Sequence, residues 1–304
     1  MPAHLLWIPV TIWAAFAQTV RNAAQRHLTA ELGTLGATLV RFLYGLPFAA
    51  AWLAAVWGFT GSAIPQGGGS FFAWVLVGAV SQIGATALLL RTMQARNFAL
   101  GVAYSKTEVL QVAVFGFVFL DDRINGVAVM AVLAGTLGVL LLSPADKERP
   151  LRALVTGWTS RTALLGLACG ALFAMSAVGY RGAAIALPGV PFLMAAAYTL
   201  VAAQLLQTVL LGGWLLMRDP DVVRRVLRAW RISLFAGFMG AAASAGWFTA
   251  FAIEPVAHVR TLGLIELVFS YAISRKFFRE RLSSLELAGM ALLAVGVVVI
   301  LLAA

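Results

Sequence analysis

The sequence predicts an all-α integral membrane protein with ten transmembrane helices, arranged as two inverted five-helix repeats. Three observations lead to this prediction. Of the 304 residues, 62% are hydrophobic and only 11% are charged, and the mean hydropathy is +0.92. Soluble domains are about half apolar and about a quarter charged, so both values indicate a membrane protein. The third observation, a similarity between the two halves of the chain, indicates the repeats.

Apolar stretches of about 20 residues can cross the hydrocarbon of a bilayer as helices. Short connections join these stretches, and the polar linker 144–161 separates a first repeat, residues 1–143, from a second repeat, residues 162–304. The two repeats together are expected to form one unit. The predicted spans are 4–24, 35–57, 71–91, 98–120, 124–142, 162–182, 191–217, 232–253, 256–274 and 283–303.

The segment 219–231 is predicted to lie along the membrane surface rather than to cross it. Asp219 suits the N-cap of a helix, and Pro220 suits the first helical position. Apolar residues then recur at helical spacing against four arginines, which is typical of a basic amphipathic helix on anionic lipid headgroups. An ordinary loop before the next span is the alternative. The arginines are Arg224, Arg225, Arg228 and Arg231.

The distribution of basic residues predicts the orientation of the chain. The net charge is +10, and most of the 22 lysines and arginines lie in loops that follow odd-numbered spans. Such loops are cytoplasmic by the positive-inside rule, so both termini are expected outside a bacterial-type cytoplasmic membrane. Short basic runs between apolar segments favour an anionic membrane surface as partner, not nucleic acid. No basic residue precedes the first apolar stretch, so we expect a mature helix there and no signal peptide.

The two halves of the chain share charged and glycine positions. When Glu108 is aligned with Glu266, Arg123 meets Arg281 and Gly138 meets Gly296. Because five helices per repeat is an odd number, the halves must cross the membrane in opposite senses. This is the inverted-repeat plan of secondary transporters, in which the substrate site lies near the midplane between the repeats.

Glu108 and Glu266 each lie about half-way along an apolar span. An ionised side chain facing lipid costs at least about 2.5 to 3.5 kcal/mol, so both glutamates are expected to face an internal cavity. Lys106 lies about 200° around an ideal helix from Glu108 and is a poor partner for it. Each of the two therefore needs a partner on another helix, water or a solute.

Three sequence motifs resemble the EamA-type ten-helix transporters of the drug/metabolite transporter superfamily, over essentially the whole chain. They are "VRFLYG" with Arg41, "KTEVLQVAVFGFVFLDDR" at 106–123 and "LIELVFSYAISRKFFRER" at 264–281. Val109 and Leu267 stand where proline is common in the family, so the helix kinks of the family are not predicted. The resemblance implies a transporter that moves small metabolites, including amino acids, out of the cytoplasm. Some members instead exchange phosphorylated compounds.

Glu108 and Glu266 are the leading candidates for coupling, because a buried carboxylate can alternate between a proton and a cationic cargo. A purely structural role in helix packing is the alternative. Lys106 and Arg260 can present two cations to a carboxylate or phosphate, although Arg260 can also extend to the membrane surface. Polar or aromatic groups that can line the same cavity, or equally make ordinary helix contacts, are Tyr104, Gln18, Gln82, Trp247 and Tyr180. Arg41 is expected near a helix start with a structural role, and His258 close to the membrane surface.

The leading functional hypothesis is a secondary transporter that exports small polar metabolites by alternating access, with proton coupling or exchange both open. An antiporter of organic anions or phosphorylated metabolites is the alternative within transport, and a non-transporting membrane partner subunit is the alternative outside it. An enzyme is not expected, because the three histidines are scattered and Ser105 faces a different side of its helix from Lys106. The single Cys169 suggests no disulfide, and no metal or cofactor is expected. A monomer is sufficient for one pathway, and a dimer stays open.

Overall fold

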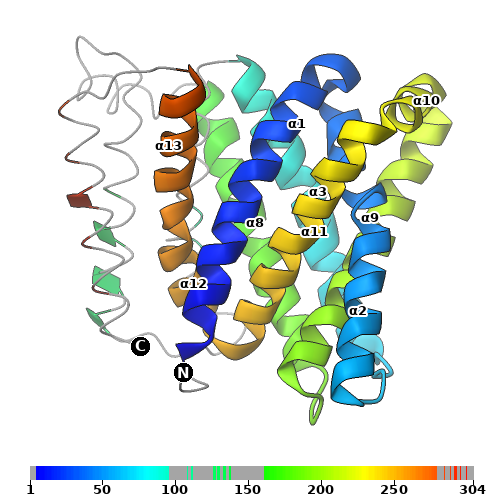
Figure 1. The fold of residues 1–304 in the computed structure, drawn as a ribbon, viewed down its shortest axis with the longest axis vertical. Helices are drawn as coiled ribbons and strands as arrows, with labels where there is room; N and C mark the ends of the chain where they lie inside the picture. Colours follow the sequence, from blue (N-terminus) through cyan, green and yellow to red (C-terminus); the bar gives the residue numbers. More distant parts are fainter. Residues whose placement is uncertain are drawn as a thin grey trace. The chain divides into compact units, whose positions relative to one another are not determined.

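The computed structural model describes residues 5–95 and 161–278 continuously, together with isolated residues between 108 and 137 and between 284 and 299. All regular structure in these ranges is helical (Figure 1). Five helices in them are long and apolar enough to cross a membrane. The predicted all-helical class is confirmed. The spans predicted at 98–120, 124–142 and 283–303 lie outside the continuous ranges, so the count of ten and the inverted repeats stay predictions.

The chain forms two compact units. The first unit contains residues 1–83 and 176–254, and the second contains residues 84–175 and 255–304. Each unit thus takes residues from both halves of the sequence. The helices α3 (Gly69–Ala95) and α8 (Arg161–Ile185) each contribute residues to both units.

The first two predicted spans are joined by a sharp reversal at Gly33. The helix α1 (Trp7–Leu43) continues through the connection expected at 25–34, except at Gly33, whose φ of 72° and ψ of 176° are not helical. Gln25 Nε2 donates a hydrogen bond to the carbonyl oxygen of Ala37 at 3.1 Å. Because twelve residues of straight helix would separate these groups by about 18 Å, the chain must double back at Gly33. Glycine adopts this positive φ without the steric cost that a Cβ would add.

The second span continues in α2 (Leu46–Thr60), after a short interruption at Tyr44 and Gly45. The helix α2 ends at Gly61, which has a φ of 63° and donates its N–H to the carbonyl of Trp57 at 3.0 Å. This left-handed cap stops the helix at the glycine-rich connection that precedes α3. Phe59, at the end of α2, is 92% exposed.

The later helices of the first unit follow the predicted spans closely. They are the end of α8, α9 (Phe192–Arg218) and α11 (Trp230–Ile253). A Cβ on Gly179 of α8 would lie 2.8 Å from the backbone nitrogen of Gly78 on α3, so the two helices approach through their glycines. A core of aliphatic and aromatic side chains from α2, α3, α8, α9 and α11 fills the first unit, including Phe71, Leu200 and Phe248.

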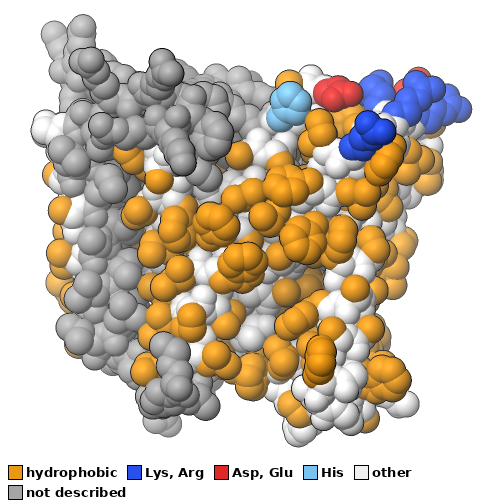
Figure 2. Space-filling view, in the orientation of Figure 1, with side chains coloured by type: hydrophobic (Ala, Val, Ile, Leu, Met, Phe, Trp, Pro, Cys, Tyr) orange, Lys and Arg blue, Asp and Glu red, His pale blue; other side chains and the backbone are white. Residues whose placement is uncertain are grey.

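The predicted surface helix is present as α10 (Pro220–Arg228). Asp219 Oδ1 accepts a hydrogen bond from the backbone N–H of Val222 at 3.3 Å, which confirms the N-cap. Val222 and Val226 are buried, and the Tyr44 hydroxyl donates to the carbonyl of Val226 at 3.2 Å. One side of α10 therefore packs on the protein. Figure 2 shows basic side chains gathered at the corner where α10 lies, at the edge of a broad apolar surface.

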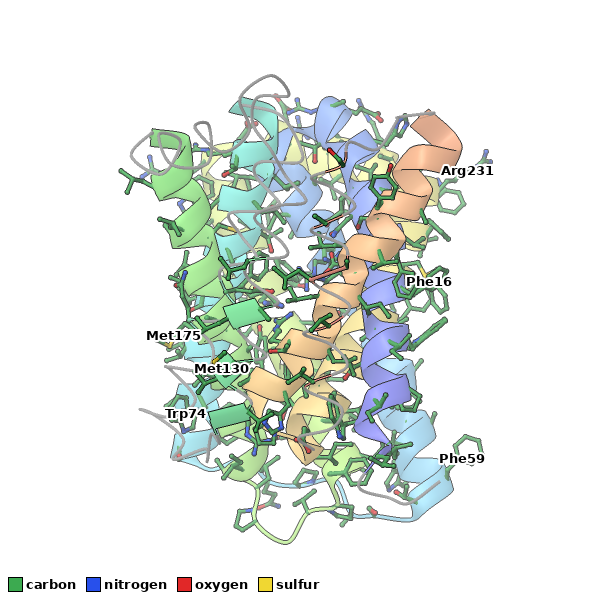
Figure 3. The ribbon with its side chains drawn as sticks, turned by 90° about the vertical axis from the view of Figure 1, so that its left-hand side faces the viewer. Phe16, Phe59, Trp74, Met130, Met175 and Arg231 are labelled. Atoms are coloured by element: carbon green, nitrogen blue, oxygen red, sulfur yellow. The ribbon has the colours of Figure 1, made fainter. Side chains whose placement is uncertain are left out.

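Two ends of the first unit can be told apart in Figure 3. Phe16 of α1 and Phe59 of α2 point outward from their helices, whereas Arg231, the second residue of α11, lies toward the end opposite to Phe59. Both phenylalanines are exposed. Aromatic side chains exposed on apolar helices are expected where a protein meets lipid.

The predicted span 256–274 is helical but is built from three pieces in the second unit. A helix α12 (Val256–Leu262) is followed by a 3₁₀ turn, η2 (Gly263–Ile265), and then by α13 (Glu266–Phe278). The change in hydrogen-bond pattern falls directly before Glu266, although no proline is present there. A 3₁₀ stretch inside a helix often marks a functional hinge.

Candidate functional site

Three buried side chains from three helices form a hydrogen-bonded triangle in the first unit. The hydroxyl of Tyr180, on α8, donates to Oε1 of Gln82, on α3, at 3.0 Å. Gln207, on α9, donates from Nε2 to the same Gln82 oxygen at 2.7 Å and to the Tyr180 oxygen at 2.9 Å. Gln82 and Tyr180 were predicted as cavity-lining residues, and the fold brings them into direct contact.

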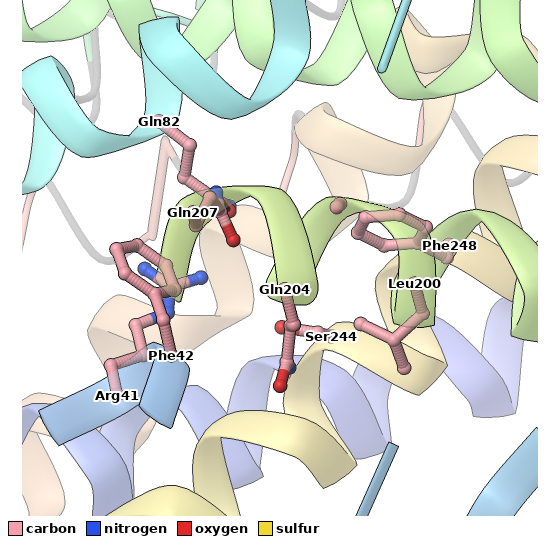
Figure 4. Close-up of a pocket in the computed structure, with 9 residues that line it drawn as sticks. Arg41, Phe42, Gln82, Leu200, Gln204, Gln207, Ser244 and Phe248 are labelled. Atoms are coloured by element: carbon pink, nitrogen blue, oxygen red, sulfur yellow. Dashed lines mark hydrogen bonds between the residues drawn. The ribbon is translucent and has the colours of Figure 1, made fainter. Parts of the chain in front are cut away.

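The triangle adjoins a narrow polar crevice, shown in Figure 4. In this conformation the lining side chains fill it so closely that no space remains for a solute. The polar groups come from the end of α1, from α3, from α9 and from α11. The crevice is lined by Arg41, Phe42, Gln82, Leu200, Ala203, Gln204, Gln207, Ser244 and Phe248.

Arg41 is placed differently from the expectation. It lies in the last turn of α1 rather than near a helix start, because α1 ends at Leu43 before the interruption at Gly45. Its side chain is only 4% exposed and its guanidinium lies 5.5 Å from the centroid of the Phe42 ring. Arg41 is therefore one of the polar residues that line the crevice.

A second pair of predicted residues, Gln18 on α1 and Trp247 on α11, is also in contact in the first unit. The Trp247 indole N–H donates to Gln18 Oε1 at 2.9 Å. The Trp247 ring stacks on Phe251, with 6.0 Å between the ring centroids. Neither Gln18 nor Trp247 is among the residues that line the crevice.

The second unit holds a buried ion pair. Arg260 Nη1, on α12, lies 3.7 Å from Glu108 Oε1, and the two side chains are 8% and 7% exposed. Arg260 is therefore buried beside a carboxylate. The pair supplies the partner on another segment that Glu108 was expected to need. Lys106 and Tyr104 lie outside the described residues.

Glu266, the other predicted carboxylate, is 3% exposed at the first position of α13. His258 is buried on α12, two residues before Arg260. In the described part of the chain, no group of three or more His, Cys, Asp or Glu residues could hold a metal ion.

Comparison with protein families then identifies the second half of the sequence. Residues 160–302 match the model of the EamA-like transporter family. This half of the chain is therefore similar to EamA-like transporters. The resemblance that the motifs indicated is confirmed. The EamA-like region includes Tyr180, Gln204, Gln207, Arg260 and Glu266, and the family description is that of a membrane transporter.

A solved structure described only as "Crystal structure of protein" is similar over nearly the whole length. It is 16% identical to this chain, with a TM-score of 0.66, and the match covers 99% of this chain and 96% of that one. At this identity the likeness concerns the fold alone. Comparison with curated proteins gives no match.

The sequence analysis did not predict that Arg41, Gln204, Gln207 and Ser244 line the crevice. A signal for the glutamines was present, because Gln204 and Gln207 are three residues apart within an apolar span. Polar residues at this spacing share a helix face, and inside a membrane span they face protein or water rather than lipid.

Proposed function

We propose that this protein is a secondary transporter of the bacterial-type cytoplasmic membrane that exports small polar metabolites, such as amino acids, by alternating access coupled to protons. The observation that carries the proposal is the buried pair of Glu108 and Arg260 in an EamA-like membrane protein. Buried charges inside membrane proteins are costly and commonly mark ion or substrate pathways.

The Glu108 and Arg260 pair suits a proton-controlled switch. Two opposite charges removed from water stabilise each other only while both remain charged and close together. A proton that binds Glu108 neutralises the carboxylate and leaves the Arg260 cation without that attraction. The paired and protonated states therefore favour different local arrangements, and the proton gradient can bias the equilibrium between two conformations.

Glu266 is proposed as a second carboxylate of the same function. It is buried at the start of α13, directly after the 3₁₀ turn at Gly263–Ile265. A change in its charge would act where the helix already departs from regular α geometry. A small shift in hydrogen bonding there can alter the direction of α13.

The test is efflux from liposomes that contain only the purified protein. A labelled panel of amino acids is loaded, with and without an imposed proton gradient. Selective efflux that responds to the gradient is expected, and Glu108→Gln is expected to lose this response while the protein still folds. Asp221→Asn is the matched control, because Asp221 is an exposed carboxylate paired with Arg224 at 3.0 Å. Efflux by Glu108→Gln equal to wild type at every pH would contradict the coupling role.

A second candidate function, exchange of organic anions or phosphorylated metabolites, is favoured by buried arginines in the first unit. Arg21 is 3% exposed, and both Arg21 and Arg41 lie beside Gly240 of α11. Arginine guanidinium groups are well suited to bind a carboxylate or phosphate. Efflux that requires a second anion on the opposite side of the membrane would support this function over proton-coupled export.

Anionic lipid headgroups are the proposed partner of residues 219–231. Two valines hold α10 on the protein, while Arg224 is 71% exposed and Leu227 and Trp230 are exposed as well. Arginines near the membrane surface gain about 1 kcal/mol each from anionic lipid. Replacing Arg224, Arg225 and Arg228 by glutamine is expected to reduce the thermal stabilisation that phosphatidylglycerol gives the detergent-solubilised protein. Unchanged stabilisation would argue against a lipid site on α10.

A further inference from the structure

Two buried oxygen atoms in the crevice lack hydrogen-bond partners among the described residues. They are Oε1 of Gln204 and Oε1 of Gln207, on successive turns of α9. Both side chains are at least 97% buried. A buried carbonyl oxygen that loses water without gaining a donor is unfavourable, so such atoms call for an explanation.

The orientation of Gln207 follows from its contacts. Its amide nitrogen donates to both Gln82 and Tyr180, which directs the amide oxygen away from these residues. Gln204 packs its amide against Gly45, with Oε1 2.7 Å from the position that a Cβ on residue 45 would occupy. The two glutamines thus present acceptors that the protein itself does not use.

The crevice also contains a cation, the guanidinium of Arg41. The crevice therefore contains two kinds of polar group. Arg41 offers hydrogen-bond donors and a positive charge, whereas Gln204 and Gln207 offer unused acceptors. A ligand that satisfies both parts must carry an anionic group and N–H donors close together.

We propose that the crevice binds the ammonium-carboxylate headgroup of the cargo, with the carboxylate at Arg41 and the ammonium at the Gln204 and Gln207 oxygens. This inference rests on the proposed export function and adds to it the ligand class and the residues that recognise it. A zwitterion fits better than a simple organic anion, because an anion without N–H groups leaves both glutamine oxygens without donors.

Binding requires the crevice to open, since its side chains fill it in this conformation. Alternating access supplies such a change, and the closed form corresponds to a state without cargo. When the crevice opens, the glutamine oxygens can accept hydrogen bonds from water or from the ammonium group. The cargo headgroup would thus favour the open form, because it can contact Arg41 and the two glutamines only in that form.

The test compares three related ligands in calorimetric titrations of the purified full-length protein. A panel of the common amino acids first identifies the tightest ligand. Its deaminated carboxylic acid and its decarboxylated amine are then titrated as matched probes. Wild type is expected to bind the amino acid most tightly.

Gln204→Leu is expected to weaken amino-acid binding about tenfold to a hundredfold, the usual effect of losing a hydrogen bond to a charged group. Its affinity for the deaminated acid should stay within about twofold, because that ligand has no group for Gln204. Arg41→Gln should show the reverse selectivity, weakening the acid but not the amine. Thr199→Val is the control, since Thr199 carries a buried unpartnered hydroxyl on α9 but does not line the crevice.

Equal losses for the amino acid and its deaminated analogue in Gln204→Leu would overturn the headgroup site. Gln204→Glu keeps an acceptor and adds charge, so it should retain or increase affinity for the amine. If Gln204→Leu does not fold, the affinity of Gln204→Glu for the amine tests the site instead, and a clear loss of that affinity would overturn it. Failure of wild-type liposomes to release any amino acid would instead refute the proposed function. Normal efflux by wild type would leave the proposed function standing. If Gln204→Leu and Gln204→Glu then bind the amino acid, the acid and the amine with the same relative affinities as wild type, only the headgroup site is refuted.

Discussion

Arg181 of α8 donates hydrogen bonds to the carbonyl oxygen of Glu254 at 2.9 Å and to that of Phe251, at the C-terminal end of α11. The last carbonyls of a helix lack intrahelical donors, and a cation there also interacts favourably with the helix dipole. Arg181 thus ties the ends of α8 and α11 together within the first unit.

Arg181→Met is expected to destabilise the protein by about 1.5 to 3 kcal/mol, the range for hydrogen bonds to a charged donor. Arg181→Lys should recover part of the loss, because a lysine keeps the charge but not the two-pronged donor geometry. Thermal unfolding of the detergent-solubilised protein measures both changes. A Met variant as stable as wild type would show that solvent replaces the arginine at these carbonyls.

Removing one partner of the buried ion pair should lower the free energy of unfolding more than removing both partners does. Arg260→Met leaves the Glu108 carboxylate buried without its cation, which typically costs about 3 to 5 kcal/mol. The double variant Arg260→Met with Glu108→Gln should be more stable than Arg260→Met alone. Stabilities measured for the four proteins of this mutant cycle give the coupling between the two sites. Strict additivity would mean that the groups 3.7 Å apart do not interact.

Gly179→Ala is expected to separate α3 from α8. The added methyl would lie 2.8 Å from the Gly78 backbone nitrogen, which cannot move aside as a side chain can. Overpacking of this kind costs about 1 to 3 kcal/mol. Gly213→Ala on α9 is the control, since nothing lies within 4 Å of the Cβ position there. Equal melting temperatures for the two variants would argue against close glycine packing at this crossing.

Cysteine labelling tests the predicted orientation. The single native cysteine, Cys169, is buried and gives little background. A membrane-impermeant maleimide added to intact cells should label Phe59→Cys but not Arg231→Cys. After permeabilisation it should label both, because the two positions lie at opposite ends of the first unit (Figure 3). Labelling of Arg231→Cys in intact cells would reverse the proposed topology.

Much of the architecture could be predicted because transmembrane helices leave a local signal. Twenty apolar residues in a row identify a span without knowledge of its neighbours, and α3, α8, α9 and α11 lie close to the predicted ranges. The surface helix α10 was also predictable, since its cap at Asp219 and its spacing of valines and arginines are contained within a few residues.

The contacts between distant segments depended on the tertiary structure. Gln82, Tyr180 and Gln207 are far apart in sequence, and only the packing of α3, α8 and α9 joins them in one triangle. The pairing of Glu108 with Arg260 likewise follows from the fold of the second unit. Hydropathy and helical spacing report on single helices, and they carry no information about which faces of two helices meet. The sequence by itself therefore determined the all-helical class, the spans that the structure describes and the resemblance to EamA-like transporters, whereas side-chain packing decided which polar groups share a site.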